Sequence, residues 1–308
     1  MRRFDLNDLL RDYHQRPKPT DGRLVQLSGL DGMDGYNPSR TIADNGDLFT
    51  YVRVEHRDDE FSSWSAPFVQ TNVVNWHMLP EMPMLKLQDP AVAVIHGTLV
   101  VSGVRLVAKT GTCVHFRTVF WRGSSVRTLE EFAHSPLQWK DTRLVELENG
   151  CVGVFTRPLG GSAGRGKIAY AEVDDLDSLR PEVIAGAKLL DVQPIDEQWW
   201  GPNDIYPLGD GRLGILGHVA KYTGRNCHYF AFVAVFDRNR RRIVDGPHVI
   251  CDRSCFPAYP AKRRDLQDVI FPASINRPEG LLFAGLSDSG VGVVSVGDPF
   301  AQFVHESG

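Results

Sequence analysis

Three pairs of polar residues recur along the chain at one spacing. In each pair an Asn or Asp is followed sixteen positions later by an arginine. The pairs are Asn37 with Arg53, Asp89 with Arg105, and Asp141 with Arg157. A carboxyl group can donate or accept a proton, and a guanidinium group can hold an oxyanion. The spacing therefore raises the question of whether these residues meet in one site.

The stretches that carry the pairs repeat with a fixed period. NPSRTIADNGDLFTYVRVE begins at residue 37, DPAVAVIHGTLVVSGVRLV at 89 and DTRLVELENGCVGVFTRPL at 141, so the starts are 52 residues apart. Weaker copies begin at Asn203, with His218 near the arginine position, and at Asp268. Two short strands joined by a tight turn would return residue n and residue n+16 to the same end of a hairpin.

Strand signals dominate the elements that must position these residues. Segments such as DLFTYVRVE, TLVVSGVRLV and YFAFVAVFD are short, rich in β-branched and aromatic residues, and bounded by turn residues. Helices are expected only over residues 6–13 and 129–133. Five repeated units that each begin with a hairpin are typical of propeller blades. We therefore predict an all-β protein, a five-bladed β-propeller forming a single domain over residues 1–308, with residues 1–30 closing or flanking it.

In such a propeller the Asn and Asp residues would surround one mouth of the central channel, together with the Arg/His set. A ring of polar groups that converges on a concave site is a functional hypothesis. The alternative is structural, because Asp and Asn at strand starts also cap turns and Arg at strand ends forms ion pairs between blades.

Composition excludes several classes of protein. Lys and Arg number 34 against 38 Asp and Glu, so no strong basic field points to nucleic acid. The basic run at 237–242 is interpreted as a hairpin turn. The chain shows no apolar run near the length of about 20 residues that spans a bilayer, and no signal peptide, which favours the cytoplasm. The five cysteines lack the paired spacing of a zinc site and are interpreted as reduced thiols: Cys113, Cys151, Cys227, Cys251 and Cys255.

Two motifs invite other functions and are set aside. GSAGRGKI at 161–168 is close to a phosphate-binding P-loop, but Ile168 stands where a Ser or Thr is required and the following KIAYAEV predicts a strand. A Gly-rich loop beside a phosphate site is the better interpretation. GDGRLG at 209–214 matches a dinucleotide fingerprint, but it predicts a hairpin turn. Trp199 and Trp200 either pack between blades or form a platform for a sugar.

The repeated units resemble a known family. The order of NPSR…YVRVE, QDPAV, WKDTRLVE…FTRPL, WGPNDI…GRLGILGHVA and DVIFPA…GLLFAGLSDS is similar to that of the five-bladed mannoside phosphorylases of glycoside hydrolase family 130. Within that group, the chain most resembles the mannosyltransferase/phosphorylases that make and break β-1,2-mannan. The resemblance covers residues of about 30 to 295.

This resemblance implies roles for particular residues. Asp89 would be the general acid that protonates the glycosidic oxygen, directly or through a sugar hydroxyl. The phosphate-binding positions would be Lys140, Arg157 and His218. The substrate-binding positions would be Asn37, Arg53, Asp141 and Asp288, with Arg105 and Asn203 as further members of the repeat. One departure concerns the acid, because Gln88 and Ala91 replace the Glu and Arg of the family's Glu-Asp-Pro-Arg motif.

The residue types themselves are compatible with phosphorolysis. An inverting hydrolase needs a second carboxylate to activate water, whereas phosphate is already a nucleophile and needs cations to hold it. Asp141 could serve as that second carboxylate, so an inverting β-mannosidase is an alternative, as is a propeller that only binds a glycan or a protein. The expected ligands are a mannose-containing oligosaccharide and phosphate or a sugar phosphate, with no cofactor and no metal. Whether the donor is mannose 1-phosphate or a nucleotide-mannose, and the oligomeric state, stay open.

Overall fold

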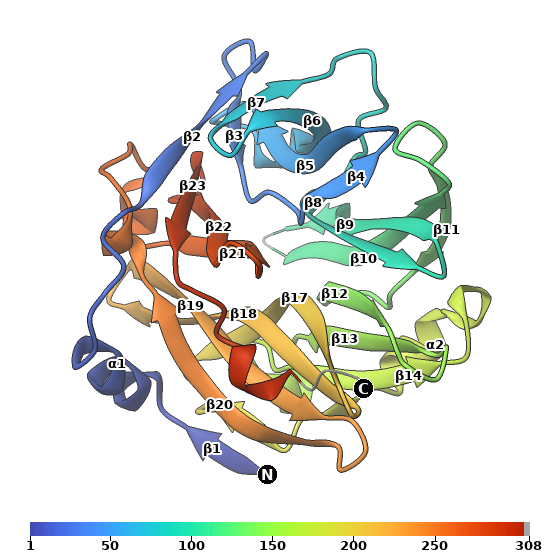
Figure 1. Cartoon of the computed structure of the whole chain (residues 1–308), viewed down its shortest axis with the longest axis vertical. Helices are drawn as coiled ribbons and strands as arrows, with labels where there is room; N and C mark the ends of the chain where they lie inside the picture. Colours follow the sequence, from blue (N-terminus) through green and yellow to red (C-terminus); the bar gives the residue numbers. More distant parts are fainter. Residues whose placement is uncertain (112, 305–308) are drawn as a thin grey trace.

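The structure, a computed structural model, describes residues 1–111 and 113–304. Antiparallel sheets are arranged in a ring around a central axis (Figure 1), and α-helix is confined to short segments. The helices are α1 (Leu6–His14), α2 (Pro181–Ala185) and the 3-10 turns η1 (Glu60–Ser62), η2 (Gly161–Ala163), η3 (Leu176–Ser178), η4 (Arg253–Cys255), η5 (Arg264–Leu266) and η6 (Ala301–Phe303). The all-β prediction is confirmed. No helix among the described residues has both the length and the apolar character needed to cross a membrane.

The strands of the described residues form four sheets. The first has nine strands: β2 (Arg23–Ser28), β3 (Asp34–Tyr36), β4 (Ile42–Asp44), β5 (Asp47–Glu55), β6 (Trp64–Asn72), β7 (Asn75–Met78), β21 (Ile270–Asn276), β22 (Leu281–Leu286) and β23 (Gly290–Ser295). The second has eight: β8 (Gln88–Ile95), β9 (Thr98–Thr110), β10 (Cys113–Gly123), β11 (Glu130–His134), β12 (Trp139–Glu146), β13 (Val152–Pro158), β14 (Ala169–Val173) and β15 (Lys188–Leu189). The smaller sheets contain β17 (Trp199–Gly209), β18 (Arg212–Thr223), β19 (Asn226–Asp237) and β20 (Arg242–Cys251), and β1 (Arg2–Phe4) with β16 (Val192–Pro194).

The two large sheets are composite. In the eight-stranded sheet one parallel residue pair, Arg117 with Trp139, joins β10 to β12, so β8–β11 and β12–β15 are separate antiparallel groups. In the nine-stranded sheet β2 pairs with β23 along its first half and with β7, in parallel, along its second half. A strand from the start of the chain therefore lies beside the last strand and links the two ends of the ring (Figure 1).

The polar residues of the repeat lie at bulges in the strands that begin the hairpins. The ladder shifts register between Gln88 and Ala91 in β8 and between Lys140 and Arg143 in β12. Asp89 and Asp141 fall in these bulges with φ of 51°, and Asn37, in the loop after β3, has φ of 46°. Asn and Asp tolerate this left-handed conformation better than other residues with a side chain. The repeated residue type thus follows from a repeated backbone shape.

The fifth copy of the repeat is displaced from its expected start. The bulge in β21 lies between Pro272 and Ser274, so Ala273 occupies the position that Asp89 and Asp141 hold in their strands. Asp268, where the copy was expected to begin, instead contacts His228 at 3.2 Å. The repeat therefore contributes no acid at this position of the ring.

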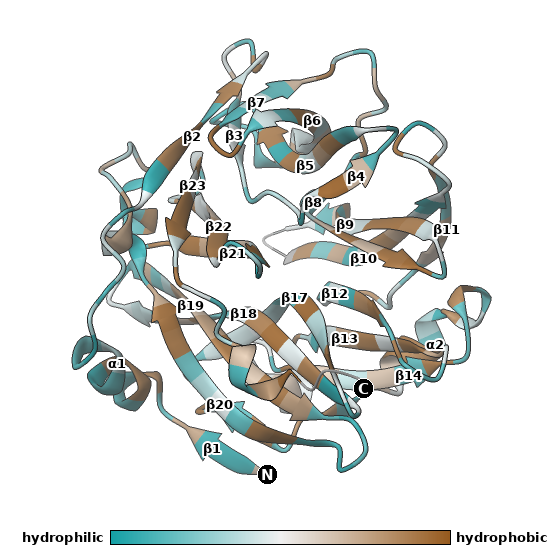
Figure 2. Ribbon diagram, in the orientation of Figure 1, coloured by the Kyte–Doolittle hydropathy of each residue, from teal (hydrophilic) through white to brown (hydrophobic). Residues whose placement is uncertain are grey.

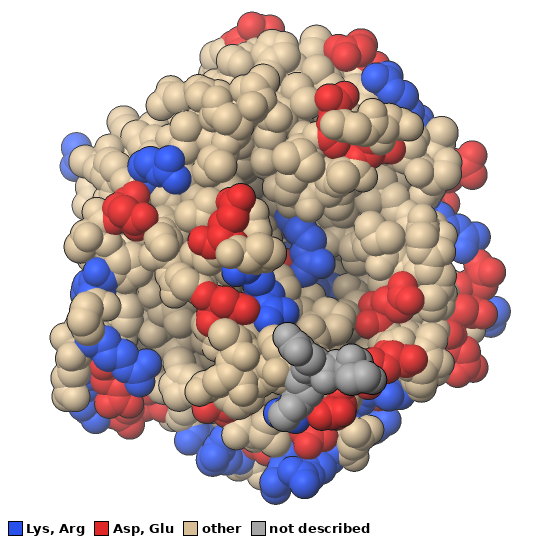
Figure 3. All heavy atoms as spheres, in the orientation of Figure 1, with Lys and Arg blue, Asp and Glu red and all other residues tan. Residues whose placement is uncertain are grey.

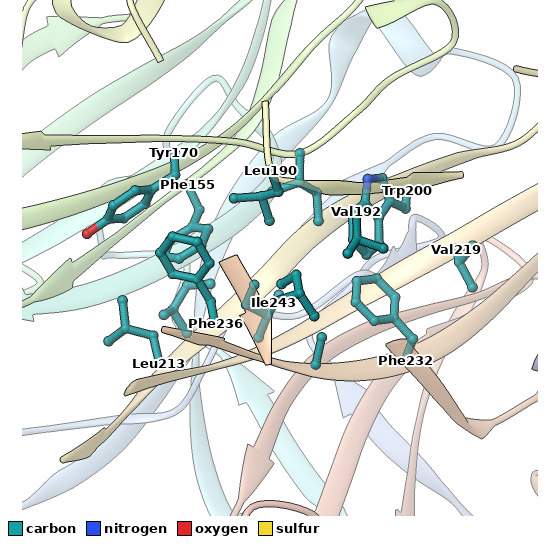
Figure 4. Close-up of a cluster of buried hydrophobic side chains, with 14 of the residues drawn as sticks. Phe155, Tyr170, Leu190, Val192, Trp200, Leu213, Val219, Phe232, Phe236 and Ile243 are labelled. Atoms are coloured by element: carbon teal, nitrogen blue, oxygen red, sulfur yellow. The ribbon is translucent and has the colours of Figure 1, made fainter. Parts of the chain in front are cut away.

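Apolar side chains fill the spaces between neighbouring sheets. Figure 2 shows that hydrophobic residues concentrate in the strands, whereas α1 is largely hydrophilic. The cluster drawn in Figure 4 brings together residues of β13, β14 and β17 to β20. In it Trp200 stacks on Phe232 with ring centroids 5.1 Å apart. Trp199 is also buried and packs against Tyr222 and Tyr229, so both tryptophans serve packing.

Of the two helices expected from the sequence, one is confirmed. Helix α1 occupies Leu6–His14, and the side chain of Asp5 caps it by accepting a hydrogen bond of 2.8 Å from the Asn7 amide. The helix expected over residues 129–133 is wrong, because Glu130–His134 forms β11. This segment pairs with β10, with Ala133 opposite Phe120, so sheet pairing overrides its weak local helical preference.

Candidate active site

Asp89 is held from the neighbouring hairpin. Asn37 Nδ2 donates to Asp89 Oδ1 at 2.8 Å, and Arg53 Nη1 donates to the same oxygen at 3.2 Å. Among the described residues, no group hydrogen-bonds the other oxygen, Oδ2. One carboxylate oxygen is thus fixed by the protein, and the other is left to face a ligand.

A buried carboxylate orients Arg53. Glu55 Oε2 accepts hydrogen bonds from Arg53 Nε at 2.9 Å and Nη2 at 2.8 Å, and also from the hydroxyl of Ser63. Glu55 Oε1 accepts from Tyr36 and Lys262. Burial opposes ionisation of Glu55, but its cationic and hydroxyl partners outweigh burial and hold its pKa below the usual value. Arg53 is therefore fixed with one nitrogen left for Asp89.

A second cluster surrounds Asp141. Arg157 Nε lies 2.8 Å from Asp141 Oδ2, and His218 Nε2 lies 3.9 Å from the same oxygen. Arg157 Nη1 donates to His218 Nε2 at 3.1 Å, and His218 Nδ1 lies 2.8 Å from Asn203 Oδ1. Because arginine can only donate, Nε2 is the acceptor and Nδ1 carries the proton that is donated to Asn203. His218 is thus a neutral imidazole.

Close backbone approach makes this cluster possible. A Cβ atom on Gly201 would lie 2.6 Å from His218 Cε1 and 2.9 Å from Asp141 Oδ2. One on Gly166 would lie 2.9 Å from Arg157 Cδ, so the Gly-rich segment expected beside a phosphate site does contact this arginine. Glycine leaves the space that the three charged and polar side chains occupy.

Two further ionisable groups lie between and beside the clusters. Burial lowers the pKa of Lys140, and the charge of Arg157 lowers it further, while Asp141 and Asp89 act in the opposite direction. Burial raises the pKa of Asp288 to about 6 against the opposing charge of Arg53. No described carboxylate lies within 4.0 Å of the Lys140 ammonium group. Lys140 is therefore a partly desolvated cation between the two clusters.

A small cavity adjoins residues of the two clusters. A cavity of about 10 Å³, room for about one water molecule, is lined by Arg143 and by segments 38–40, 90–92, 203–204 and 271–273. Arg143 Nε donates to the backbone oxygen of Asn203 at 2.8 Å. Figure 3 shows basic side chains in a hollow near the middle of the face it displays. The small cavity itself is therefore too small to hold a sugar.

A larger pocket lies away from these clusters. It has a volume of about 720 Å³ and is lined by Gln70, Tyr206 and Asn276, among others, and by none of the predicted site residues. Its two arginines, Arg40 and Arg277, each form an ion pair with an aspartate, at 2.7 Å and 2.9 Å. We place the candidate active site at the Asp89 and Asp141 clusters because the ionisable groups converge there.

Sequence comparison identifies the family of the chain. The profile of the family described as "Protein of unknown function (DUF1861)" matches residues 12–302. The chain belongs to the DUF1861 family. No curated protein has a sequence that matches that of this DUF1861 protein significantly.

Solved structures similar to this DUF1861 protein include mannosyl-transferring enzymes. MPT-4, a mannose phosphorylase from Leishmania mexicana in complex with phosphate ion, is 28% identical, with a TM-score of 0.89 over 98% of this chain and 96% of that one. MPT-1, a GDP-Man-dependent mannosyltransferase from the same organism, is 25% identical, with a TM-score of 0.87 over 98% of both chains. A β-1,2-mannobiose phosphorylase from Listeria innocua is 15% identical over 91% of both chains, with a TM-score of 0.64, and shares the fold. These likenesses confirm the resemblance to family 130 enzymes.

The DUF1861 protein brings most of the predicted site residues together. Asn37, Arg53 and Asp89 form one contacting group, as described above. Asp141, Arg157, Asn203 and His218 form the other. Lys140 and Asp288 interact electrostatically with both Arg53 and Asp89. Their roles toward substrate and phosphate stay predictions.

Arg105 does not join either group. It forms an ion pair with Glu131 on β11 at 2.7 Å. In the first hairpin, Arg53 lies opposite Tyr36, the residue before Asn37. In the second, the residue before Asp89 is Gln88, and it lies opposite Val104 and not Arg105. A shift of one residue along a strand moves a side chain to the other face of the sheet. The structure therefore gives no contact that would support a substrate-binding role for Arg105.

Three functional candidates escaped the sequence analysis. Glu55 could have been recognised, because alternate residues of a strand share a face and Glu55 is two positions after Arg53. Lys262 and Ser63 had no such signal, since both lie in irregular segments outside the hairpins.

Two aromatic rings pack against His218. The rings of Tyr229 and Phe271 have centroids 5.2 Å and 5.0 Å from its ring.

The neutral state of His218 predicts a pH-dependent stability. Burial lowers the pKa of His218 well below its usual value, and the charges of Arg157, Lys140 and Arg143 add to this. Below pH of about 6.5 the unfolded chain binds a proton that the folded chain does not, so stability falls as pH falls. Wild type should lose about 1.4 kcal/mol more than His218→Gln between pH 7.5 and 5.5 in urea denaturation. His14→Gln, at an exposed histidine, should behave as wild type, and parallel curves for wild type and His218→Gln would contradict the assignment.

Proposed function

We propose that this DUF1861 protein transfers mannosyl units reversibly between a β-mannoside and phosphate, with mannose 1-phosphate as the sugar phosphate. The carrying observation is that Arg157 and His218 gather around Asp141. Lys140 interacts electrostatically with Arg157 and also with Asp89, a carboxyl group that has one uncommitted oxygen. Arg157 and Lys140 are cations that can hold a phosphate dianion, and a carboxyl group can protonate a leaving oxygen. His218 is neutral and orients Arg157 by accepting a hydrogen bond from it. The mannose phosphorylase and the mannosyltransferase among the similar structures support the same reaction class.

In the proposed reaction a phosphate oxygen attacks the anomeric carbon of the terminal mannose, and the bond to the glycosidic oxygen breaks. Asp89 supplies the proton that the leaving oxygen takes up, directly or through a sugar hydroxyl. Attack from the opposite face inverts the configuration at carbon 1. The proposal includes β-1,2-linked mannan oligosaccharides as substrate and a grouping of the strands into five blades.

The environment of Asp141 favours phosphorolysis over hydrolysis. An inverting hydrolase needs a carboxylate that can take a proton from water. Asp141 is 1% exposed, and Arg157 Nε lies 2.8 Å from it, so it is poorly suited to bind and deprotonate water. An inverting β-mannosidase is therefore the weaker alternative.

An acceptor-dependence experiment tests the function. The protein is incubated with mannose 1-phosphate and with mannose or mannobiose, and phosphate release is measured with and without acceptor. Release only with acceptor supports mannosyl transfer, whereas free mannose without acceptor indicates hydrolysis. A parallel reaction with GDP-mannose tests the nucleotide-sugar alternative. Binding without turnover of any donor would leave a glycan-binding propeller and refute the proposal.

A further inference from the structure

Glu55 is the most heavily hydrogen-bonded carboxylate near the site, and the proposed reaction does not use it directly. It ends β5 with a side chain that is 0% exposed. It accepts hydrogen bonds from four residues: Arg53, Ser63, Tyr36 and Lys262. A carboxylate buried at this depth is costly unless it is paired, and two cations pair with it here.

The contacts of Glu55 determine what Arg53 can do. Two nitrogens of the Arg53 guanidinium, Nε and Nη2, are bound to Glu55 Oε2, at 2.9 Å and 2.8 Å. The third nitrogen, Nη1, is then directed to Asp89 Oδ1 at 3.2 Å. A planar guanidinium bound through one edge has a fixed orientation. The Glu55 carboxylate therefore aims Arg53 at the proposed general acid.

Lys262 adds a second cation from a different part of the chain. It belongs to the segment between β20 and β21, and its side chain is 1% exposed. Besides Glu55 it lies 3.7 Å from Glu60, and its backbone amide donates to Ser287, next to Asp288, at 3.0 Å. Lys262 therefore compensates the charge of Glu55 and connects it to the turn that carries Asp288.

We propose that Glu55 and Lys262 are positioning residues of opposite charge that together set the proton affinity of Asp89 through Arg53. The proposal deepens the proposed function and rests on it. Glu55 partly neutralises the positive charge of Arg53. Without Glu55 that charge would act on Asp89 alone. Lys262 partly neutralises the negative charge of Glu55, so Glu55 neutralises less of the charge of Arg53. Neither residue touches the substrate in this assignment.

Several charged groups lie around Asp89 and its partner Arg53. They are Arg53 and Glu55 on β5, Lys140 and Arg143 on β12, Asp288 after β22, and Lys262 before β21. Glu55 and Lys262 can be changed without removing a direct partner of Asp89 or a group at the proposed phosphate site or mannose site, whereas Arg143 also holds the backbone of Asn203. They therefore offer a clean pair of opposite charges for a test.

The proposal predicts shifts of opposite sign. Glu55→Gln removes a negative charge and frees Arg53 for Asp89, so Asp89 should lose its proton at lower pH. Lys262→Met removes a positive charge, so Asp89 should keep its proton to higher pH. For a charge at a distance of the order of 10 Å in a partly buried site, each shift is on the order of one pH unit. The double variant should return close to wild type.

Two readouts measure the shifts, and the second does not depend on turnover. The first is the acid limb of the kcat/KM profile for phosphate release from mannose 1-phosphate with mannobiose, because in this direction Asp89 must be ionised to take the proton of the acceptor hydroxyl. The second is the titration of the Asp89 carboxyl carbon by NMR in protein with labelled aspartate, assigned by difference from Asp89→Asn. If wild type has no transfer activity, the proposed function fails, but the NMR titration still decides whether Glu55 and Lys262 control Asp89.

A matched control separates this role from a structural one. Glu172 also accepts from a tyrosine and an arginine, Tyr170 at 3.0 Å and Arg238 at 2.8 Å, but it lies on β14 outside the site. Glu172→Gln should lower stability without moving either readout. If Glu55→Gln does not fold, Lys262→Met and the double variant still carry the sign test. Unchanged titration of Asp89, or shifts of the same sign, would overturn the proposal.

Discussion

Asp89→Asn should lower mannosyl transfer by about 10² to 10⁴-fold while leaving the fold intact. The amide can neither supply the proton in phosphorolysis nor take it from the acceptor hydroxyl in the reverse direction, which are the steps that Asp89 is proposed to perform. Its oxygen can still accept from Asn37 and Arg53, which now contact Oδ1 at 2.8 Å and 3.2 Å. The backbone φ of 51° also suits Asn. Turnover should therefore collapse, whereas sugar binding and melting temperature should change little.

The measurement is phosphate release from mannose 1-phosphate with a mannobiose acceptor, at matched concentrations of folded protein. Asp210→Asn is the control, because Asp210 also has a positive φ, 54°, but lies in the exposed turn between β17 and β18. It should retain wild-type activity. Activity of Asp89→Asn within about threefold of wild type, far short of the loss expected for a general acid, would remove Asp89 from the mechanism.

Arg157→Ala should weaken phosphate binding by at least about 30-fold. The change removes a cation of the proposed phosphate site and leaves Asp141 as an unpaired buried carboxylate that repels the anion. Truncating one member of a buried, hydrogen-bonded charge pair typically costs about 2 to 5 kcal/mol in binding. His218 also loses the donor that now lies 3.1 Å from its Nε2. Calorimetric titration of phosphate into wild type and variant measures the effect.

Two further variants protect this prediction from misinterpretation. Arg157→Lys keeps the positive charge beside Asp141 and should fold as wild type, with an intermediate affinity because the planar donor set is lost. Arg105→Ala removes an arginine at the matching repeat position that instead pairs with Glu131. It should bind phosphate as wild type does. Equal affinity for wild type and Arg157→Ala would count against the phosphate site.

The repeat in the sequence predicted the strands that carry the site but not every side chain that reaches it. The period of 52 located Asn37, Asp89 and Asp141, because each occupies the same backbone feature with a positive φ. Arg105 does not join these residues, because the pairing of β8 with β9 is shifted by one residue relative to the pairing of β3 with β5. A bulge of this kind depends on the backbone conformation and leaves little trace in the spacing of residues.

The contact of Lys262 with Glu55 could not be predicted from the repeat. Lys262 lies in an irregular segment with no counterpart among the hairpins, and its buried contact with Glu55 joins residues more than 200 positions apart. No local sequence pattern indicates such a contact. Ser63 likewise lies between β5 and β6, outside the hairpins that begin the repeats. Site residues in connecting segments thus require the folded structure.

The position of β2 has a consequence for synthesis on the ribosome. Gln26–Ser28 can pair with β7 soon after β7 is made, but Arg23–Val25 must wait for β23, whose first residue is Gly290. At typical elongation rates of about 5 to 20 residues per second, the wait is on the order of 10 to 50 seconds. During that time the nascent chain holds an open sheet edge, a common starting point for aggregation. We therefore expect β2 to be the region where a bound chaperone protects the unfinished ring.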